Sequence, residues 1–191
     1  MKKFLTVALL AATAALPGLA FANSSLTGEV RLSDPRGGKA DSTEYRVEAW
    51  KKAFGTVLVG AELQASQPEN QGKLTSKVTG KAGTELGEFV GFKPVAYVEV
   101  GQRLADSASG GNFNFWGAGL KASRPLAGGF SLNGGYRHRE GFSEGNLKED
   151  RFHGGLSYDL TKKTSAGLTY YRTRSGGNDT DAVGLGLTSK F

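Results

Sequence analysis

Hydrophobic and polar residues alternate at every second position along most of this chain. The final segment shows the pattern clearly, because Val183, Leu185, Leu187 and Phe191 share one parity while small and polar residues occupy the other. A period of two is typical of a β-strand with one apolar face and one small or polar face. Ten segments follow the pattern, and they predict strands at residues 26–33, 43–51, 56–66, 74–86, 94–104, 113–123, 130–139, 151–160, 165–173 and 182–191.

The length of these segments suits a membrane-spanning barrel. Most lie near the ~9–11 residues that a tilted strand needs to cross a bilayer, and the alternation offers one face to lipid and the other to a polar interior. We therefore predict an all-β fold, a transmembrane antiparallel up-and-down β-barrel of about ten strands, with eight or twelve strands as alternatives. The mean hydropathy of −0.32 is compatible with this fold, because only every second strand residue faces lipid.

The connections between the expected strands alternate in character. One set is polar and rich in Gly, Ser, Asn and Asp, and the other set is mostly shorter. The polar set comprises residues 34–42, 67–73, 105–111, 141–149 and 175–180, and the other set comprises residues 52–55, 87–93, 124–129 and 161–163. Long loops face the cell exterior in such barrels and short turns face the periplasm. The link at 87–93 is long for a periplasmic turn, so the strand count is least constrained there.

Aromatic residues fall near the two ends of the expected strands. Such placement is typical of the interfacial belts of membrane proteins. Those near the outer ends are Tyr45, Trp116, Tyr136, Phe152 and Tyr170, and those near the periplasmic ends are Phe130, Tyr158 and Phe191. A soluble β-sandwich would bury aromatic residues in its core, but it would explain neither the terminal phenylalanine nor the alternation of the loops.

The first 22 residues have the features of a secretory signal peptide. Lys2 and Lys3 precede a short uncharged apolar run, and Ala20-Phe21-Ala22 forms a small-x-small cleavage site. We expect cleavage after Ala22, which assigns residues 1–22 to the signal and residues 23–191 to the barrel. The protein would then pass through the periplasm to the outer membrane.

Composition narrows the chemistry further. The chain has a formal net charge of +6 without a clustered Lys/Arg run, which does not indicate a nucleic-acid partner. It has no cysteine, so it has no disulfide and no thiolate metal site. We expect no cofactor and no metal.

The polar parity of the strands carries many charged residues into the expected interior. Charges cannot lie in a dry interior unless they are paired, so either ion pairs fill the lumen or water fills it and the charges line a channel. Ten strands lie near the size at which side chains just fill a barrel, and inward glycines leave room beside long side chains. The candidate lumen-lining residues are Arg31, Arg46, Glu48, Glu62, Lys77, Lys81, Glu99, Arg103, Lys121, Arg137, Arg139, Arg151, His153 and Asp159.

Two functions follow from such an interior. The first is a narrow porin for small hydrophilic solutes or ions, weakly favouring anions because inward base slightly exceeds inward acid. The second is a non-conducting structural or surface-interaction barrel with a salt-bridged lumen and functional external loops. The loops lack aromatic residues apart from Phe142, which is poor material for binding hot spots and favours the channel.

Catalysis is not expected. The chain has two histidines: His138 falls on the outward parity near the outer interface, and His153 points inward beside Arg151. Ser143 and Glu144 follow His138 in a loop, but in outer-membrane deacylases the histidine and serine lie close together on one strand.

The chain as a whole resembles small Gram-negative outer-membrane β-barrels. Its closing pattern of Val183, Leu185, Leu187 and Phe191 resembles the C-terminal signal read by the barrel assembly machinery, although Ser189 stands where an apolar or aromatic residue is usual. This resemblance implies outer-membrane lipid, periplasmic chaperones and the assembly machinery as partners.

A narrower resemblance is to the oligogalacturonate, acidic-sugar porin family, which usually has twelve strands and an arginine-lined lumen. It is carried by Tyr97-Val98-Glu99-Val100-Gly101, by the tyrosines at positions 158, 170 and 171, and by inward Arg137, Arg139 and Arg151. It implies a narrow monomeric barrel.

Overall fold

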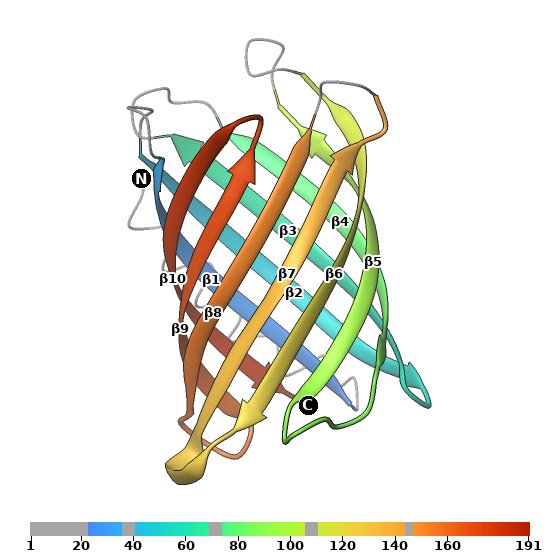
Figure 1. Ribbon diagram of the computed structural model, residues 1–191, viewed down its shortest axis with the longest axis vertical. Coiled ribbons are helices and arrows are strands. Elements are labelled where there is room, and N and C mark those ends of the chain that lie inside the picture. Colours follow the sequence, from blue (N-terminus) through green and yellow to red (C-terminus); the bar gives the residue numbers. More distant parts are fainter. Residues whose placement is uncertain (1–22, 36–40, 69–73, 106–110, 144–146) are drawn as a thin grey trace.

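Ten antiparallel strands close into one barrel in the computed structural model, which describes residues 23–35, 41–68, 74–105, 111–143 and 147–191 (Figure 1). Each strand pairs with its neighbour in sequence, and β1 pairs with β10. The strands are β1 (Ser24–Pro35), β2 (Ser42–Phe54), β3 (Val57–Pro68), β4 (Thr75–Glu85), β5 (Lys93–Leu104), β6 (Phe113–Pro125), β7 (Phe130–Gly141), β8 (Lys148–Asp159), β9 (Thr164–Ser175) and β10 (Asn178–Lys190), with a short 3-10 turn, η3 (Ala127–Gly129), before β7. The predicted all-β barrel of ten strands is confirmed.

The two ends of the sheet join through a long ladder between β1 and β10. The register runs from Ser25 opposite Lys190 to Pro35 opposite Thr180. Beyond the last strand residue, the Phe191 amide donates to the Ser24 carbonyl at 2.9 Å, and the Asn23 amide donates to the Phe191 carbonyl at 2.9 Å. Closure therefore leaves neither strand as a free edge, which a barrel needs because lipid offers no hydrogen bonds.

Several strands extend further than the hydrophobic alternation predicted. The expected loop at residues 175–180 is wrong, because β10 begins at Asn178 and follows β9 through a tight turn in which Gly176 and Gly177 have φ of +56° and +80°. The extra residues of β10 include Asp179 and Asp181 on the outward parity. A strand that rises beyond the apolar layer carries polar residues on both faces, so the alternation that marks it in the sequence ends before the strand does.

The uncertain link after β4 is a compact turn. Phe89 and Phe92 form an isolated antiparallel bridge, with Val90 at φ 51° and Gly91 at φ 77° between them. This link therefore neither splits nor merges a strand.

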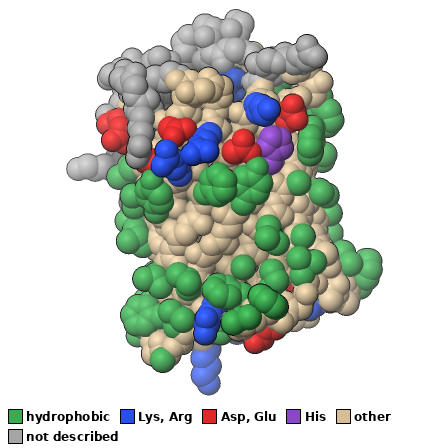
Figure 2. All heavy atoms as spheres, viewed as in Figure 1, with side chains coloured by type: hydrophobic (Ala, Val, Ile, Leu, Met, Phe, Trp, Pro, Cys, Tyr) green, Lys and Arg blue, Asp and Glu red, His purple; other side chains and the backbone are tan. Residues whose placement is uncertain are grey.

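The barrel is apolar outside and charged inside. Outward residues such as Leu63, Val100 and Leu185 are 57%, 61% and 65% exposed, whereas inward Glu62 is 1% exposed. On the face that Figure 2 shows, hydrophobic side chains form an upper and a lower band, and charged side chains gather above the upper band, with fewer at the lower edge. This inversion of a soluble fold is the pattern expected of a barrel in lipid. Within the described ranges, no helix is both long and apolar enough to cross a membrane.

Glycines on the inward face make room for large neighbours, as the sequence predicted. The Tyr97 side chain occupies the space that a Cβ at Gly119 would take, and the Phe115 ring does the same at Gly101. Gly184 leaves space for the Glu29 carboxylate. Tyr97, Phe115 and Glu29 therefore each lie over a glycine on a neighbouring strand.

Substituting Gly155 with valine should destabilise the barrel. A Cβ at Gly155 would lie 2.8 Å from the Cα of Thr169, in the backbone of β9. Overpacking of this kind typically costs about 1–3 kcal/mol. We expect the midpoint of urea unfolding in lipid vesicles to fall for Gly155→Val. Gly80→Val is the matched control, because nothing lies within 4 Å of a Cβ at that position; equal midpoints for the two variants would contradict the packing argument.

Candidate functional site

Charged side chains from seven strands meet inside the barrel. The strands are β1 to β5, β7 and β8, each contributing residues of the inward parity. Arg31 is 3% exposed and Arg139 is fully buried. The buried carboxylates are Glu29, Glu44, Glu48, Glu62, Glu99 and Glu149. Because an isolated charge is very costly to bury, each of these side chains needs a partner of opposite charge.

Glu62 on β3 is the centre of this network. Its Oε2 accepts from Arg46 Nε at 2.8 Å and from Lys81 Nζ at 2.7 Å. Its Oε1 accepts from Arg139 Nη2 at 2.8 Å and lies 3.6 Å from Arg137 Nη1. One carboxylate thereby uses both oxygens to hold four cations.

A second carboxylate, Glu99, supports the same arginines. Arg139 Nε donates a short hydrogen bond to Glu99 Oε1, and Lys81 Nζ lies 3.6 Å from Glu99 Oε2. Lys81 also donates to Glu48 Oε1 at 2.6 Å. Charge-assisted bonds of this kind are stronger than neutral ones, so Glu62, Glu99, Arg139 and Lys81 form one connected unit.

Ion pairs cross the lumen between strands that are not neighbours. Arg139 on β7 reaches Glu62 on β3 at 2.8 Å, with three strands between them in the sheet order. Lys77 on β4 lies 3.5 Å from Glu149 on β8, again with three strands between them in the sheet order. Arg151 on β8 lies 3.6 Å from Glu44 on β2, and these strands are separated by β9, β10 and β1 in the sheet order. The network therefore joins opposite walls of the barrel rather than lining one of them.

Another cluster lies beside β1, the strand that closes the barrel by pairing with β10. Arg31 donates to Glu29 Oε2 at 2.8 Å and to Glu44 Oε1 at 2.5 Å. Its guanidinium carbon is 3.9 Å from the centre of the Tyr171 ring, and the Tyr171 hydroxyl donates to Glu29 Oε1. Glu44 also accepts from Gln64 Nε2 at 2.6 Å. Tyr171 thus shields one ion pair and hydrogen-bonds to it at the same time.

Two aromatic residues on the inward face, Phe115 and Trp50, were not among the predicted lumen residues. Phe115 is fully buried, with the Arg139 guanidinium 4.9 Å from its ring. Trp50 is 7% exposed, with Lys121 Nζ 4.1 Å from its ring. Parity could have found both, because Trp50 shares the parity of Glu48 and Phe115 shares the parity of the inward glycines of β6.

Most of the predicted lumen residues belong to the network. Those joined by ion pairs are Arg31, Arg46, Glu48, Glu62, Lys77, Lys81, Glu99, Arg137, Arg139 and Arg151. Glu149 also belongs to the network, although the sequence pattern predicted it in the loop 141–149, because β8 begins three residues before the predicted strand.

The other predicted residues lie at the margin of this network. Arg103 lies 5.3 Å from the Phe113 ring, Lys121 rests on Trp50, and the His153 ring is 5.7 Å from that of Tyr171. Asp159 is exposed at the end of β8.

His138 lies outside the lumen, as its parity predicted. Its Nδ1 is 2.9 Å from Asp150 Oδ1, and its ring is 5.8 Å from that of Trp116. The Tyr136 hydroxyl donates to the same Asp150 oxygen at 2.5 Å. Among the residues that the structure describes, no group of three His, Cys, Asp or Glu could hold a metal ion.

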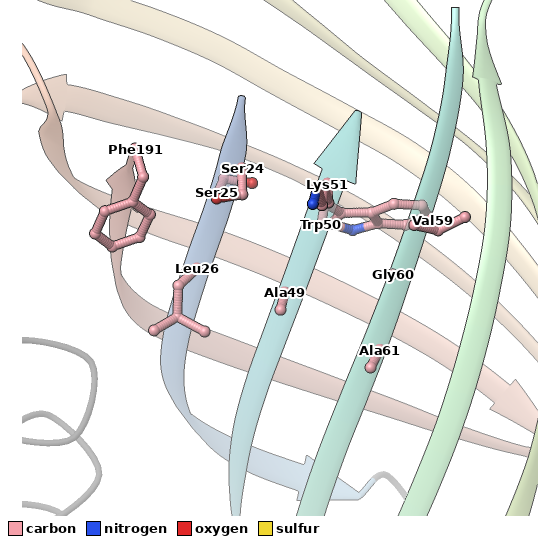
Figure 3. A pocket seen from close by; sticks show the side chains of 10 residues that line it. All are labelled: Ser24, Ser25, Leu26, Ala49, Trp50, Lys51, Val59, Gly60, Ala61 and Phe191. Atoms are coloured by element: carbon pink, nitrogen blue, oxygen red, sulfur yellow. The ribbon is translucent and has the colours of Figure 1, made fainter. Parts of the chain in front are cut away.

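An apolar groove of about 370 Å³ lies by the C-terminal residue (Figure 3). Ala49 on β2 is opposite both Leu26 on β1 and Ala61 on β3, and all three residues line the groove. Phe191 and Val59 contribute to its walls. Val183 and Leu185, of the predicted assembly signal, are outward and exposed, and Leu187 is half-buried.

Replacing Glu62 with glutamine should destabilise the barrel strongly. Four cations would lose their shared carboxylate, and breaking a buried ion pair on one side typically costs about 3–5 kcal/mol. We expect a large fall in the urea midpoint in vesicles. Glu85→Gln is the control, because Glu85 pairs with Lys52 at 2.6 Å where both side chains are about 40% exposed, and exposed pairs contribute about 0–1 kcal/mol. Similar midpoints for the two variants would show that Glu62 is not the centre of the network.

Comparison with known proteins identifies the fold class. No known family model matches the chain, and no curated protein matches its sequence. Among solved structures, the β domain of the Bordetella autotransporter BrkA superposes with a TM-score of 0.58 at 12% identity, covering 90% of this chain and 100% of that one. The translocator domain of the autotransporter NalP from Neisseria meningitidis gives 0.49 at 10% identity, covering 100% and 96%. The KdgM porin gives 0.46 at 8% identity, covering 87% and 99%. At 12% identity the superposition on the BrkA β domain shows the fold alone, a closed antiparallel β-barrel.

Proposed function

We propose that this protein is a closed outer-membrane barrel, which acts as a structural or surface-interaction protein and does not conduct. The observation that carries the proposal is the set of ion pairs across the lumen, above all that between Arg139 and Glu62. Their side chains are fully buried, and they join β7 to β3 at 2.8 Å. A water-filled channel requires the opposite walls to stay apart.

The size of the barrel supports the same conclusion. Barrels of roughly eight strands are just filled by side chains, and wide aqueous channels need about sixteen. In this protein the long side chains are supplemented by Phe115 and Trp50, both buried on the inward face. Opening a path would mean separating buried charges from their partners, which is strongly unfavourable.

If the lumen is closed, the protein acts through its outer surface and its external loops. In this proposal the signal ends at Ala22, residues 23–191 form the barrel, and Val183, Leu185, Leu187 and Phe191 guide assembly. The partners are outer-membrane lipid, periplasmic chaperones, the barrel assembly machinery and a ligand of the external loops.

One observation favours the other candidate, a narrow anion-favouring channel. Lys121 adds base to the inward face, where its Nζ lies 4.1 Å from the centre of the Trp50 ring. If such a channel conducts, Arg137→Glu combined with Arg139→Glu should shift the reversal potential toward cations. An unchanged reversal potential in a conducting protein would remove these arginines from selectivity.

Planar-bilayer recording tests the closed barrel directly. We expect the refolded protein to give no conductance steps across a salt gradient, with folding verified by its heat-modifiable gel mobility. The triple variant Glu62→Ser, Arg137→Ser, Arg139→Ser should give steps, because it removes side chains that cross the lumen. Arg172→Ser combined with Asp179→Ser is the control, since this 2.6 Å pair is on the outer face.

The outcomes separate the two functions. Silence of the wild type and of the control, with steps from the triple variant, supports the closed barrel. Regular steps from the folded wild-type protein overturn it and leave the channel as the function.

A further inference from the structure

Two arginines stand directly opposite each other inside the barrel. Arg137 on β7 and Arg151 on β8 are register partners, and both side chains point inward. Like charges placed opposite on neighbouring strands repel and destabilise a sheet. Something on this part of the wall must offset that repulsion.

The carboxylates nearby are too few to do so alone. Arg137 Nη2 and Arg151 Nη2 share one oxygen of Glu149, at 2.9 Å and 3.4 Å, and Lys77 Nζ lies 3.5 Å from its other oxygen. Three cations therefore share Glu149. The other carboxylates beside Arg137, Glu62 at 3.6 Å and Glu99 at 3.9 Å, are already bonded to Arg139. Glu44, 3.6 Å from Arg151, is already bonded to the guanidinium of Arg31.

The same arginines carry buried N–H groups without an acceptor. Arg151 Nη1 and Arg137 Nε make no hydrogen bond among the described residues, although the two residues are only 8% and 5% exposed. They lie 3.6 Å from Glu44 Oε1 and 3.9 Å from Glu99 Oε1, which is too far for a hydrogen bond. Arg139 Nη1, two residues along the same strand from Arg137, is a third such donor. Leaving a buried donor unsatisfied costs about 1–3 kcal/mol, and more for charged groups.

We propose that a small inorganic anion of the halide class binds inside the barrel, beside Arg137, Arg151 and Lys77. It would accept hydrogen bonds from these N–H groups and add negative charge beside Glu149, which three cations share. A compact monovalent ion suits this place, because it makes several contacts without a required geometry and has little volume. The site is independent of conduction, and in the closed barrel it is loaded when the protein folds.

Bromide is the probe. The protein is refolded and crystallised in sodium bromide, and anomalous scattering locates the ion. We expect a peak in contact with the guanidiniums of Arg137 and Arg151. Electron density with no anomalous signal at that position would mean an ordered water only, and it would overturn the proposal.

Stability provides the second measurement. The urea midpoint in vesicles should rise and saturate with bromide when ionic strength is held constant with a bulky anion, because the ion binds the folded state alone. Arg151→Gln should lose the saturable rise or need at least a tenfold higher bromide concentration. Arg174→Gln, whose side chain is 61% exposed, should keep the wild-type response.

Controls keep the test decisive. If Arg151→Gln does not fold, Lys77→Met removes a second cation of the site and should weaken the bromide response in the same way. An equal bromide response in wild type and in a folded variant would show general salt screening and would overturn the site. Bilayer recordings on the same samples distinguish this failure from that of the closed barrel. If the protein gives no conductance steps and binds no bromide, the anion site is refuted and the closed barrel is not.

Discussion

Closure of the sheet at β1 and β10 is the constraint on which the rest of the structure depends. In the hydrocarbon layer a backbone group cannot bond to water, so every strand needs two neighbours. The ladder from Ser25–Lys190 to Pro35–Thr180, extended by Phe191, gives the first and last strands their second neighbour. Once the sheet is closed, each side chain must point either into lipid or into the lumen, and parity alone decides which.

Parity then sets the chemistry of the interior. The inward positions bring cations and carboxylates from opposite walls within bonding distance, as Arg139 and Glu62 illustrate at 2.8 Å. They also bring large residues against glycines, as with Tyr97 and Gly119. Packing and electrostatics cooperate here, because the glycines leave the volume that long charged side chains need to reach one another.

The alternation in the sequence predicted the strand number, the two faces and the charged lumen, since a period of two is a local property of strands. It could not predict which charges pair, because Lys77 and Glu149 are far apart in sequence and meet only across the closed barrel. It also missed the outer ends of the strands. Glu149 and Asp179 lie where a strand has left the apolar layer, and there neither face is hydrophobic.

A charged interior has a consequence beyond stability. Apolar residues of similar volume could fill such a lumen equally well or better, since buried ion pairs often contribute little net free energy. Strands apolar on both faces, however, would lose the contrast that specifies register, because a one-residue slip would then expose nothing unfavourable to lipid. In this chain a slip of β3 by one residue would turn Glu62 into the membrane and Leu63 into the lumen. The network thus helps to specify which face of each strand meets lipid, and it does so whether the finished barrel conducts or stays closed.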